Sequence, residues 1–205
     1  MSRPRRLIGV IGTHTEVGKT WVTSRLLSIL RKRGLRVAAR KPVQSYSPDS
    51  GPTDADQLAD ASGESRESVC PPHRCYELPM APPMAADALT RGSISLDALI
   101  AEIRWPADSD VGFVETVGGA RSPLAHDGDS VDLIKRLAVD EVLLVADAGL
   151  GTLNAVRLTL ACLAPLPTTV FLNRYDPNDD LHRRNRDWLL AKDGVPAITD
   201  LAAWR

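Results

Sequence analysis

The sequence lacks both an excess of one charge and any long apolar run. Its 205 residues include 25 Lys or Arg against 26 Asp or Glu, so no net electrostatic field favours nucleic acid or a membrane surface as a partner. No apolar stretch approaches the ~20 residues that a bilayer span requires. The basic residues 1–6 precede an apolar segment that is short and interrupted by glycines, which is not typical of a secretory signal. We therefore expect a cytoplasmic protein.

Cysteine is scarce as well. The chain has three Cys residues, and an odd number argues against a disulfide framework. Cys70, His73 and Cys75 lie close together in the sequence, but a fourth metal ligand is missing nearby and two prolines lie between them. This pattern disfavours a zinc site, and we expect buried or inert thiols instead.

The length fits one domain with a sizeable core, residues 1–205. Runs that are apolar almost throughout alternate with helical patterns, which predicts a mostly parallel sheet covered on both faces, a three-layer α/β/α fold. The predicted strands are residues 7–11, 36–40, 111–115, 141–146 and 168–172, and the predicted helices between or after them are residues 18–33, 130–137, 152–163 and 179–190. Ligands of such folds bind at the carboxyl ends of the strands.

Residues 46–91 depart from this alternation. They are rich in Pro, Ser and Asp, with a helical pattern over residues 54–61 that is broken afterwards by prolines at positions 71, 72, 79, 82 and 83. Met80, Met84 and Leu89 recur at helical spacing, which indicates packing rather than a disordered linker. We expect loops and short helices that lie over the active face.

A glycine-bounded loop, from Gly12 to Gly18, joins the first strand to the first helix, and Lys19 and Thr20 follow directly. In such a loop backbone N–H groups face a polyphosphate, a lysine neutralises it and a hydroxyl ligates Mg²⁺. A turn without a ligand is disfavoured by the Lys-Thr pair, and a dinucleotide site by the absence of G-x-G-x-x-G. Five residues separate the glycines where the common pattern has four, which indicates a particular branch of phosphate-loop proteins.

Two more predicted strands end in charged residues. Lys41 stands where the second strand stops against a proline, and Glu115 ends the third strand just before Gly118 and Gly119. A carboxylate opposite a phosphate loop suits a Mg²⁺–nucleotide site, and glycines let the backbone approach a ligand closely. Either charge alone would be an ordinary surface group, but both at the edge that carries the loop predict a catalytic site.

The loop from Gly12 to Thr20, GTHTEVGKT, resembles the signature of the dethiobiotin synthetase family, which has the phosphate-loop NTPase fold. Three further motifs resemble that family in the same order: KPVQS from Lys41, VE at Glu115 with its following glycines, and the loop from Asp147 to Asn154. The resemblance implies an ATP-dependent ligase of biotin synthesis. Such an enzyme carboxylates 7,8-diaminopelargonate with CO₂ and closes the ring to dethiobiotin, through a carbamate and a carbamic–phosphoric anhydride.

The resemblance also implies a set of metal ligands, with ATP and Mg²⁺ as cofactors. Thr20, Asp54 and Glu115 would ligate Mg²⁺, and Asp49 and Asp56 are the neighbouring alternatives to Asp54.

Catalytic roles follow from the same resemblance. Lys19 and Lys41 would hold the γ-phosphate and the carbamate, while Thr15 and Glu16 would meet the diamine end of the substrate. Further nucleotide contacts would come from Gly12, Thr13, Val17, Gly18 and Asn173, and further substrate contacts from Ser45, Gly118, Thr152, Leu153 and Asn154. The last three would bind the substrate carboxylate from the neighbouring subunit, which implies a homodimer with active sites at its interface.

The chain departs from the family pattern at two places. Thr116 and Val117 stand where the family has Gly-Ala, and little chain follows Pro196. Asn173 is then the one remaining candidate to read the base, so we expect weak preference among nucleoside triphosphates.

Two other functions stay open from the residues alone. One is a related ATP-dependent ligase that acts on another small amine or acid, and the other is a partner-regulating ATPase dimer. The second class usually carries an additional lysine early in the phosphate loop, where this chain has Thr13, His14 and Thr15. We expect small-molecule substrates, with no nucleic acid and no membrane as partner.

Overall fold

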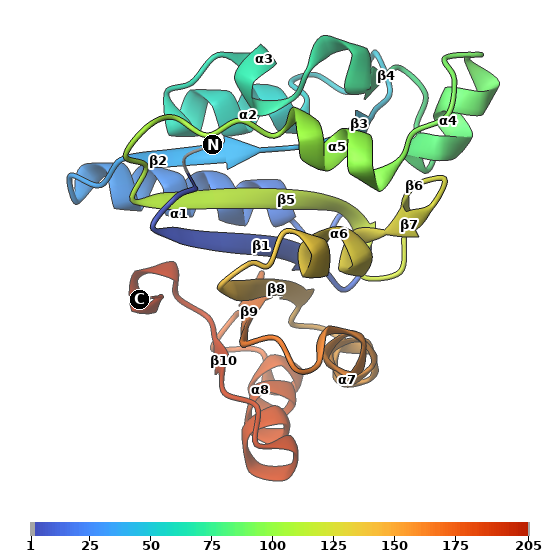
Figure 1. Ribbon diagram of the computed structural model, residues 1–205. Coiled ribbons are helices and arrows are strands. Elements are labelled where there is room, and N and C mark those ends of the chain that lie inside the picture. Colours follow the sequence, from blue (N-terminus) through green and yellow to red (C-terminus); the bar gives the residue numbers. More distant parts are fainter. Residues whose placement is uncertain (1–2, 205) are drawn as a thin grey trace.

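The computed structural model describes residues 3–204, so residues 1, 2 and 205 at the ends of the predicted domain lie outside it. A central sheet runs in the order β10-β9-β8-β1-β5-β2, and each of its pairings is parallel (Figure 1). Its strands are β1 (Arg6–Gly12), β2 (Val37–Arg40), β5 (Val111–Gly119), β8 (Glu141–Asp147), β9 (Thr168–Asn173) and β10 (Ala197–Ile198). The predicted parallel sheet is confirmed.

Helices cover both faces of this sheet, which confirms the three-layer fold (Figure 1). Because successive side chains of a strand point to opposite faces, Ile8 and Val10 of β1 pack with α1 and α2, whereas Leu7 and Ile11 pack with the helices of the other layer. The helices are α1 (Lys19–Lys32), α2 (Asp54–Ser62), α3 (Arg66–Val69), α4 (Pro82–Ala88), α5 (Leu96–Glu102), α6 (Ser130–Arg136), α7 (Thr152–Leu163) and α8 (Asp180–Asp193), with 3-10 turns η1 (Pro72–Arg74) and η2 (Leu201–Ala203).

Strand β5 continues past Glu115, where the sequence predicted its end. The Thr116 hydroxyl donates to the Val10 carbonyl at 3.0 Å, and the pairing with β1 resumes, after a register shift, at Gly12 opposite Gly119. A Cβ atom at Gly119 would lie 2.9 Å from the Thr13 carbonyl oxygen. Glycine at this position therefore lets the end of β5 run directly against the start of the phosphate loop.

The segment of residues 46–91 contains the expected loops and short helices, with two corrections. Pro82 and Pro83 begin α4 instead of breaking a helix, because a proline in the first turn has no intrahelical N–H bond to lose. The packing predicted for Met80, Met84 and Leu89 is wrong, since their side chains are 36%, 57% and 40% exposed. Helix α4 buries its small residues instead, which leaves the large ones outside.

Two short strand pairs lie outside the main sheet and were not predicted. Strand β3 (Gln44–Ser45) pairs in parallel with β4 (Cys75–Tyr76), so that Gln44 lies opposite Cys75 and Ser45 opposite Tyr76. The other pair is the antiparallel β6 (Pro123–Ala125) and β7 (Gly128–Asp129). The first pair ties the loop that follows β2 to residues 75–76 inside the 46–91 segment.

Over residues 3–204, no helix has the length and apolar character that crossing a membrane demands. The three cysteines are free thiols; Cys70 and Cys75 are buried, as predicted, and Cys162 is half-buried.

Candidate active site

The loop that follows β1 is shaped to hold an anion. It turns through Glu16 and Gly18, whose φ angles are 64° and 91°, and Gly18 then caps α1. A Cβ atom at Gly18 would lie 2.2 Å from Nδ2 of Asn173, so only glycine fits there. No side chain caps the start of α1 and its first turn holds no acidic residue. The first N–H groups of this 14-residue helix are therefore available to phosphate oxygens.

Two residues at the end of β9 brace the loop from beside it. Asn173 donates from Nδ2 to the Val17 carbonyl at 2.8 Å. Arg174 donates to the Glu16 carbonyl at 2.9 Å and to Oδ2 of Asp147 at 3.1 Å. These bonds fix the part of the loop whose backbone has positive φ, so the loop is held in shape by the fold rather than by a ligand.

Lys19 reaches back over the loop, and its Nζ donates to the Gly118 carbonyl at 2.9 Å. The side chain is almost fully buried. Burial, together with the positive charge of Lys41, lowers the pKa of Lys19 to about 8, although Glu115 and Asp54 oppose the shift. Among residues 3–204 no carboxylate forms an ion pair with this buried ammonium, so it is a group that a phosphate would stabilise.

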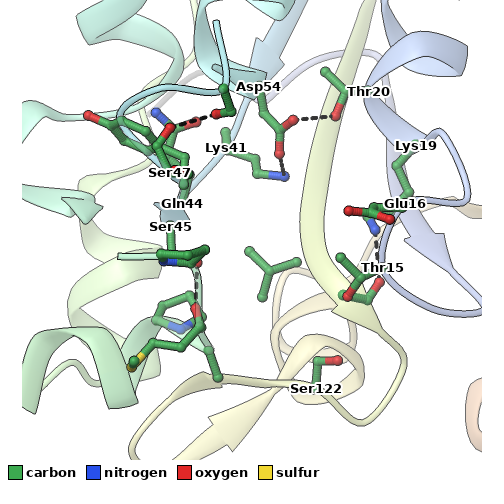
Figure 2. Close-up of a pocket in the computed structure, with 18 of the residues that line it drawn as sticks. Thr15, Glu16, Lys19, Thr20, Lys41, Gln44, Ser45, Ser47, Asp54 and Ser122 are labelled. Atoms are coloured by element: carbon green, nitrogen blue, oxygen red, sulfur yellow. Dashed lines mark hydrogen bonds and ion pairs between the residues drawn. The ribbon is translucent and has the colours of Figure 1, made fainter. Parts of the chain in front are cut away.

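Four side chains meet beside Lys19: Thr20, Lys41, Asp54 and Glu115. Figure 2 shows the contacts of Asp54 with Thr20 and Lys41. Lys41 Nζ lies 2.7 Å from Oδ2 of Asp54 and 2.9 Å from Oε1 of Glu115, and it also donates to the Thr116 carbonyl at 3.1 Å. Burial alone would lower the pKa of Lys41, but the charges of Asp54 and Glu115 outweigh it and raise that pKa. The charge of Lys41 in turn lowers the pKa of Asp54. Lys41 is therefore a permanent cation.

The Thr20 hydroxyl lies 2.8 Å from Oδ1 of Asp54 and 2.7 Å from Oε1 of Glu115. A hydroxyl has one proton, so it can donate to only one of these carboxylates at a time. The oxygens of Thr20, Asp54 and Glu115 therefore converge with one hydroxyl proton among them. Such a set of oxygen ligands suits a hard divalent cation such as Mg²⁺. The Thr23 hydroxyl donates to the other oxygen of Glu115 at 2.9 Å, which fixes the orientation of this carboxylate.

The alternatives to Asp54 as metal ligand are otherwise engaged. Asp56 forms a capping box with Thr53 at the start of α2 and an ion pair with Arg66 at 2.8 Å. Asp49 is exposed in the loop that precedes α2.

A cavity of about 920 Å³ opens over this centre. Residues of the phosphate loop form one wall of it, and β3 and the loop before α4 form the opposite wall (Figure 2). The predicted residues that line it are Thr15, Glu16, Gly18, Lys19, Thr20, Lys41, Ser45, Asp54 and Gly118. Glu115 has no exposed surface and lies beneath Thr20 and Lys41. Ser45 is fixed by a hydrogen bond to the Met80 carbonyl at 2.6 Å.

Three predicted substrate residues lie away from this cavity. Thr152, Leu153 and Asn154 begin α7 and are not part of its wall. The helix start has no side-chain cap, and Leu150, just before it, is 92% exposed. Within one subunit, therefore, these residues do not meet Lys41.

Several cavity residues had no assigned role from the sequence: Gln44, Tyr46, Ser47, Ser50, Ser122 and Arg174. Gln44 stands inside the motif that begins at Lys41, and Arg174 directly follows Asn173, so proximity to a motif was the available signal. Ser122 offered none, because its position depends on the turn after β5.

Comparison with known proteins agrees with this geometry. A family model described as an AAA domain matches residues 6–201. The chain is similar to the ATP-dependent dethiobiotin synthetase of Haloferax mediterranei, with 36% identity over 93% of this chain and 81% of that protein. It is 39% identical to the enzyme of the same name from Anaeromyxobacter dehalogenans, over 83% of this chain and 78% of that protein. A putative plasmid partition protein from Borrelia burgdorferi, solved with AMPPNP, has a TM-score of 0.55 over 97% of this chain and 88% of that one. At 13% identity, it shares the fold alone.

Proposed function

The chain belongs to the family of ATP-dependent dethiobiotin synthetases, and from this membership we propose how its cavity carries out their reaction. The protein is an ATP-dependent ligase that carboxylates 7,8-diaminopelargonate and closes the ring to dethiobiotin. The observation that supports the site is the convergence of Thr20, Asp54, Glu115 and Lys41 beside an uncapped helix start.

The nucleotide would lie with its phosphates in the loop from Gly12 to Thr20. The uncapped N–H groups of α1 and the Lys19 ammonium would bind the phosphate oxygens. Thr20, Asp54 and Glu115 would hold Mg²⁺, which when bound would spread the negative charge of the phosphates. The loop residues Thr13 and Val17 would contribute backbone contacts, and Asn173 would keep the loop in shape.

The diamine would occupy the rest of the cavity, between the phosphate loop and β3. The Glu16 carboxylate suits an ammonium-bearing substrate, and the hydroxyls of Thr15 and Ser45 can bond amine hydrogens. Glu16 and Thr15 lie on the same wall as Lys19, so an amine bound there would be next to the transferred phosphate. Gly118 would allow close approach because it carries no side chain.

The reaction then requires positioning and charge neutralisation rather than a protein nucleophile. One amine takes up CO₂ to form a carbamate and releases a proton. A carbamate oxygen attacks the γ-phosphate, ADP leaves, and the second amine attacks the carbonyl carbon and expels phosphate. Lys41, with its raised pKa, cannot act as a base near neutral pH and would instead hold the carbamate against the phosphate.

We further propose that the substrate carboxylate is bound by the partner subunit, through Thr152, Leu153 and Asn154. The uncapped start of α7 offers N–H groups to an anion, and the exposed Leu150 beside it favours burial at an interface. The enzyme would then be a homodimer of ATP-binding domains in the cytoplasm, with two sites at its interface and without nucleic acid or membrane as partner.

A coupled assay tests the function. ATP turnover by the protein should require both diaminopelargonate and bicarbonate, and mass spectrometry should detect dethiobiotin as the product. A matched set of other diamines and amino acids serves as the control. Turnover with another small amine would instead identify a related ligase, and turnover that depends on DNA or a protein partner would contradict the assignment.

A further inference from the structure

Two thiols lie in contact outside the catalytic centre. Sγ of Cys70 is 3.5 Å from Sγ of Cys75, and the turn η1 between them returns the chain on itself. Cys70 directly follows α3 and Cys75 begins β4. Neither thiol takes part in the proposed reaction. The separation is short enough that a modest side-chain rotation would bring the two sulfurs within bonding distance.

The two thiols have different surroundings. Cys75 lines a second cavity, of about 560 Å³, which also contains Arg66 and Arg91. Its Sγ accepts hydrogen bonds from Nε2 of Gln44 at 3.3 Å and from Nη2 of Arg66 at 3.8 Å. Cys70 lies beneath it with no exposed surface. Cys75 therefore borders the cavity, whereas Cys70 does not.

The charges around the pair favour a thiolate on the sulfur that borders the cavity. The pKa of Cys75 is lowered, chiefly by the hydrogen bond from Cys70, although burial opposes the shift. The hydrogen bond from Gln44 and the charges of Arg66 and Arg91 lower this pKa further. The hydrogen bond to Cys75 and burial raise the pKa of Cys70. Thiolates are the nucleophilic form of cysteine, so Cys75 is the more nucleophilic thiol of the pair.

We propose that Cys75 is a site of oxidative modification by hydrogen peroxide, with Cys70 as the thiol that resolves it into a disulfide. The Cys75 thiolate attacks one peroxide oxygen, the O–O bond breaks, and hydroxide leaves, so that Cys75 becomes a sulfenic acid. The Cys70 sulfur then attacks Sγ of Cys75 and its proton leaves with the hydroxyl as water. The pair loses two electrons and the Cys70 proton, the peroxide is reduced to hydroxide and water, and a thiol reductant reverses the change.

The disulfide would act on the active site through Gln44, and this second half of the inference rests on the proposed function. Gln44 lies opposite Cys75 in the β3–β4 pair. Its Oε1 accepts from the Ala55 N–H at 3.0 Å, and its Nε2 also reaches the Thr53 hydroxyl at 3.3 Å. One amide thus joins the thiolate to the start of α2, where Asp54 stands. A disulfide sulfur is a weaker acceptor than a thiolate, so oxidation would release this amide and loosen the proposed metal ligand.

The thiol reaction is tested first, on the protein with Cys162→Ser, which removes the one remaining thiol. Peroxide should remove two hydrogens from the intact mass and yield a peptide pair cross-linked between Cys70 and Cys75. With Cys70→Ser added, a dimedone adduct should appear at Cys75. With Cys75→Ser added instead, Cys70 should stay reduced. Oxidation of Cys70 in that last variant, or failure of the disulfide to form, would overturn the site.

Coupling to the active site is tested by Mg²⁺–ADP titration, which needs no diaminopelargonate. Oxidised protein should bind Mg²⁺–ADP at least about fivefold more weakly than reduced protein, and dithiothreitol should restore the affinity. The Cys75→Ser variant should bind equally before and after peroxide. Equal affinity of the oxidised and reduced proteins would overturn the coupling. A protein that binds as expected but makes no dethiobiotin would instead contradict the proposed function and leave the thiol result standing.

Discussion

The ammonium of Lys41 lies 2.9 Å from the carboxylate of Glu115, and neither side chain is more than 2% exposed. Asp54, on the other side of the ammonium, is 42% exposed. Glu115 therefore depends on Lys41 for its charge compensation far more than Asp54 does, because water can solvate Asp54 but not Glu115.

Replacement of Lys41 with Met should destabilise the metal-free protein. Removing one partner of a buried ion pair costs about 3 kcal/mol or more, because the remaining carboxylates then repel each other. Mg²⁺ should restore much of this loss, so the variant's melting temperature should rise with Mg²⁺ more than the wild type's. Thermal unfolding with and without Mg²⁺ measures both effects. Turnover should be lost while nucleotide binding stays measurable.

The exposed Lys135 of α6 provides the control, since Lys135→Met removes the same charge and should leave melting and its Mg²⁺ response unchanged. A Lys41→Met protein that melts like wild type, or that turns over substrate, would contradict the assigned role.

Asp54 and Asp56 offer a matched pair of substitutions. Asp54→Asn should raise the Mg²⁺ concentration needed for half-maximal activity at least about tenfold, because it removes one of three converging oxygens. Asp56→Asn removes the same charge two residues away and weakens a helix cap, so it should lower stability by about 1 kcal/mol with Mg²⁺ dependence unchanged. Activity measured against Mg²⁺, beside thermal melts, separates the two. The reverse result would assign the metal to Asp56.

The catalytic centre could be predicted from the sequence because its members stand at strand ends. Gly12, Lys41 and Glu115 each follow a buried apolar run, and parallel strands bring such positions to one edge of the sheet. The strands themselves were recognisable since they are apolar almost throughout. The apolar runs did not predict how far β5 continues, because Thr116 and the glycines after it are not apolar strand formers.

Other parts of the site depend on contacts that produce no periodic pattern in the sequence. Strands β3 and β4 have two residues each, which is too few to show an alternation of apolar and polar residues. The Gln44–Cys75 pairing could therefore not be predicted. The bond from Arg174 to the Glu16 carbonyl joins residues 158 apart in sequence. A helical spacing of Met80, Met84 and Leu89 indicated packing, but only Met84 lies within α4, which buries Ala85 and Ala86 instead. Spacing locates a helix better than it identifies the face the helix buries.

The depressed pKa of Lys19 should make nucleotide binding proton-linked. With a pKa of about 8, about half of the free protein's Lys19 is neutral at pH 8, and a triphosphate beside it restores the charged form. Binding should therefore take up roughly half a proton at pH 8 and almost none at pH 6.5. Calorimetric titration in two buffers with different ionisation enthalpies measures the uptake.

Lys19→Arg is the control for this linkage, because a guanidinium does not titrate in this range; the uptake should disappear. The same shift affects the free protein. Since the unfolded chain still binds the proton between about pH 8 and the ordinary value of 10.5, this group should add stability as the pH rises through that window. Equal proton uptake by the Arg variant would assign the linkage to another residue.

Mixed dimers test the shared site. A subunit with Lys41→Ala and a subunit with Asn154→Glu each form dead homodimers if each site needs both residues from different subunits. After subunit exchange, one of the two sites in each heterodimer is intact, so an equal mixture should recover up to about a quarter of wild-type activity.

The arrangement of the same two substitutions supplies the control. When both stand on one chain, its heterodimer with wild type has no intact site, so that mixture should lose activity instead of gaining it. If each site is instead built from one subunit, the first mixture should stay dead while the second keeps its activity, and this result would contradict the shared site, as would a monomer in solution.

The last prediction concerns the base of the nucleotide. The expected phosphate contacts, from the loop backbone, Lys19 and Mg²⁺, do not distinguish one base from another. Asn173 is the candidate reader, but its Nδ2 donates to the Val17 carbonyl at 2.8 Å and its side chain is nearly buried. Because this buried amide is already bonded to the loop, it adds little discrimination between bases, and affinities for ATP, GTP and CTP should agree within roughly tenfold, about 1.4 kcal/mol. Asn173→Ala should weaken all three by the same factor, since it loosens the loop that binds their common phosphates. Titration of each nucleotide with Mg²⁺ decides between two roles for this residue. A loss confined to ATP, or a hundredfold preference for ATP in the wild type, would mean that Asn173 and the segment after Pro196 form an adenine pocket.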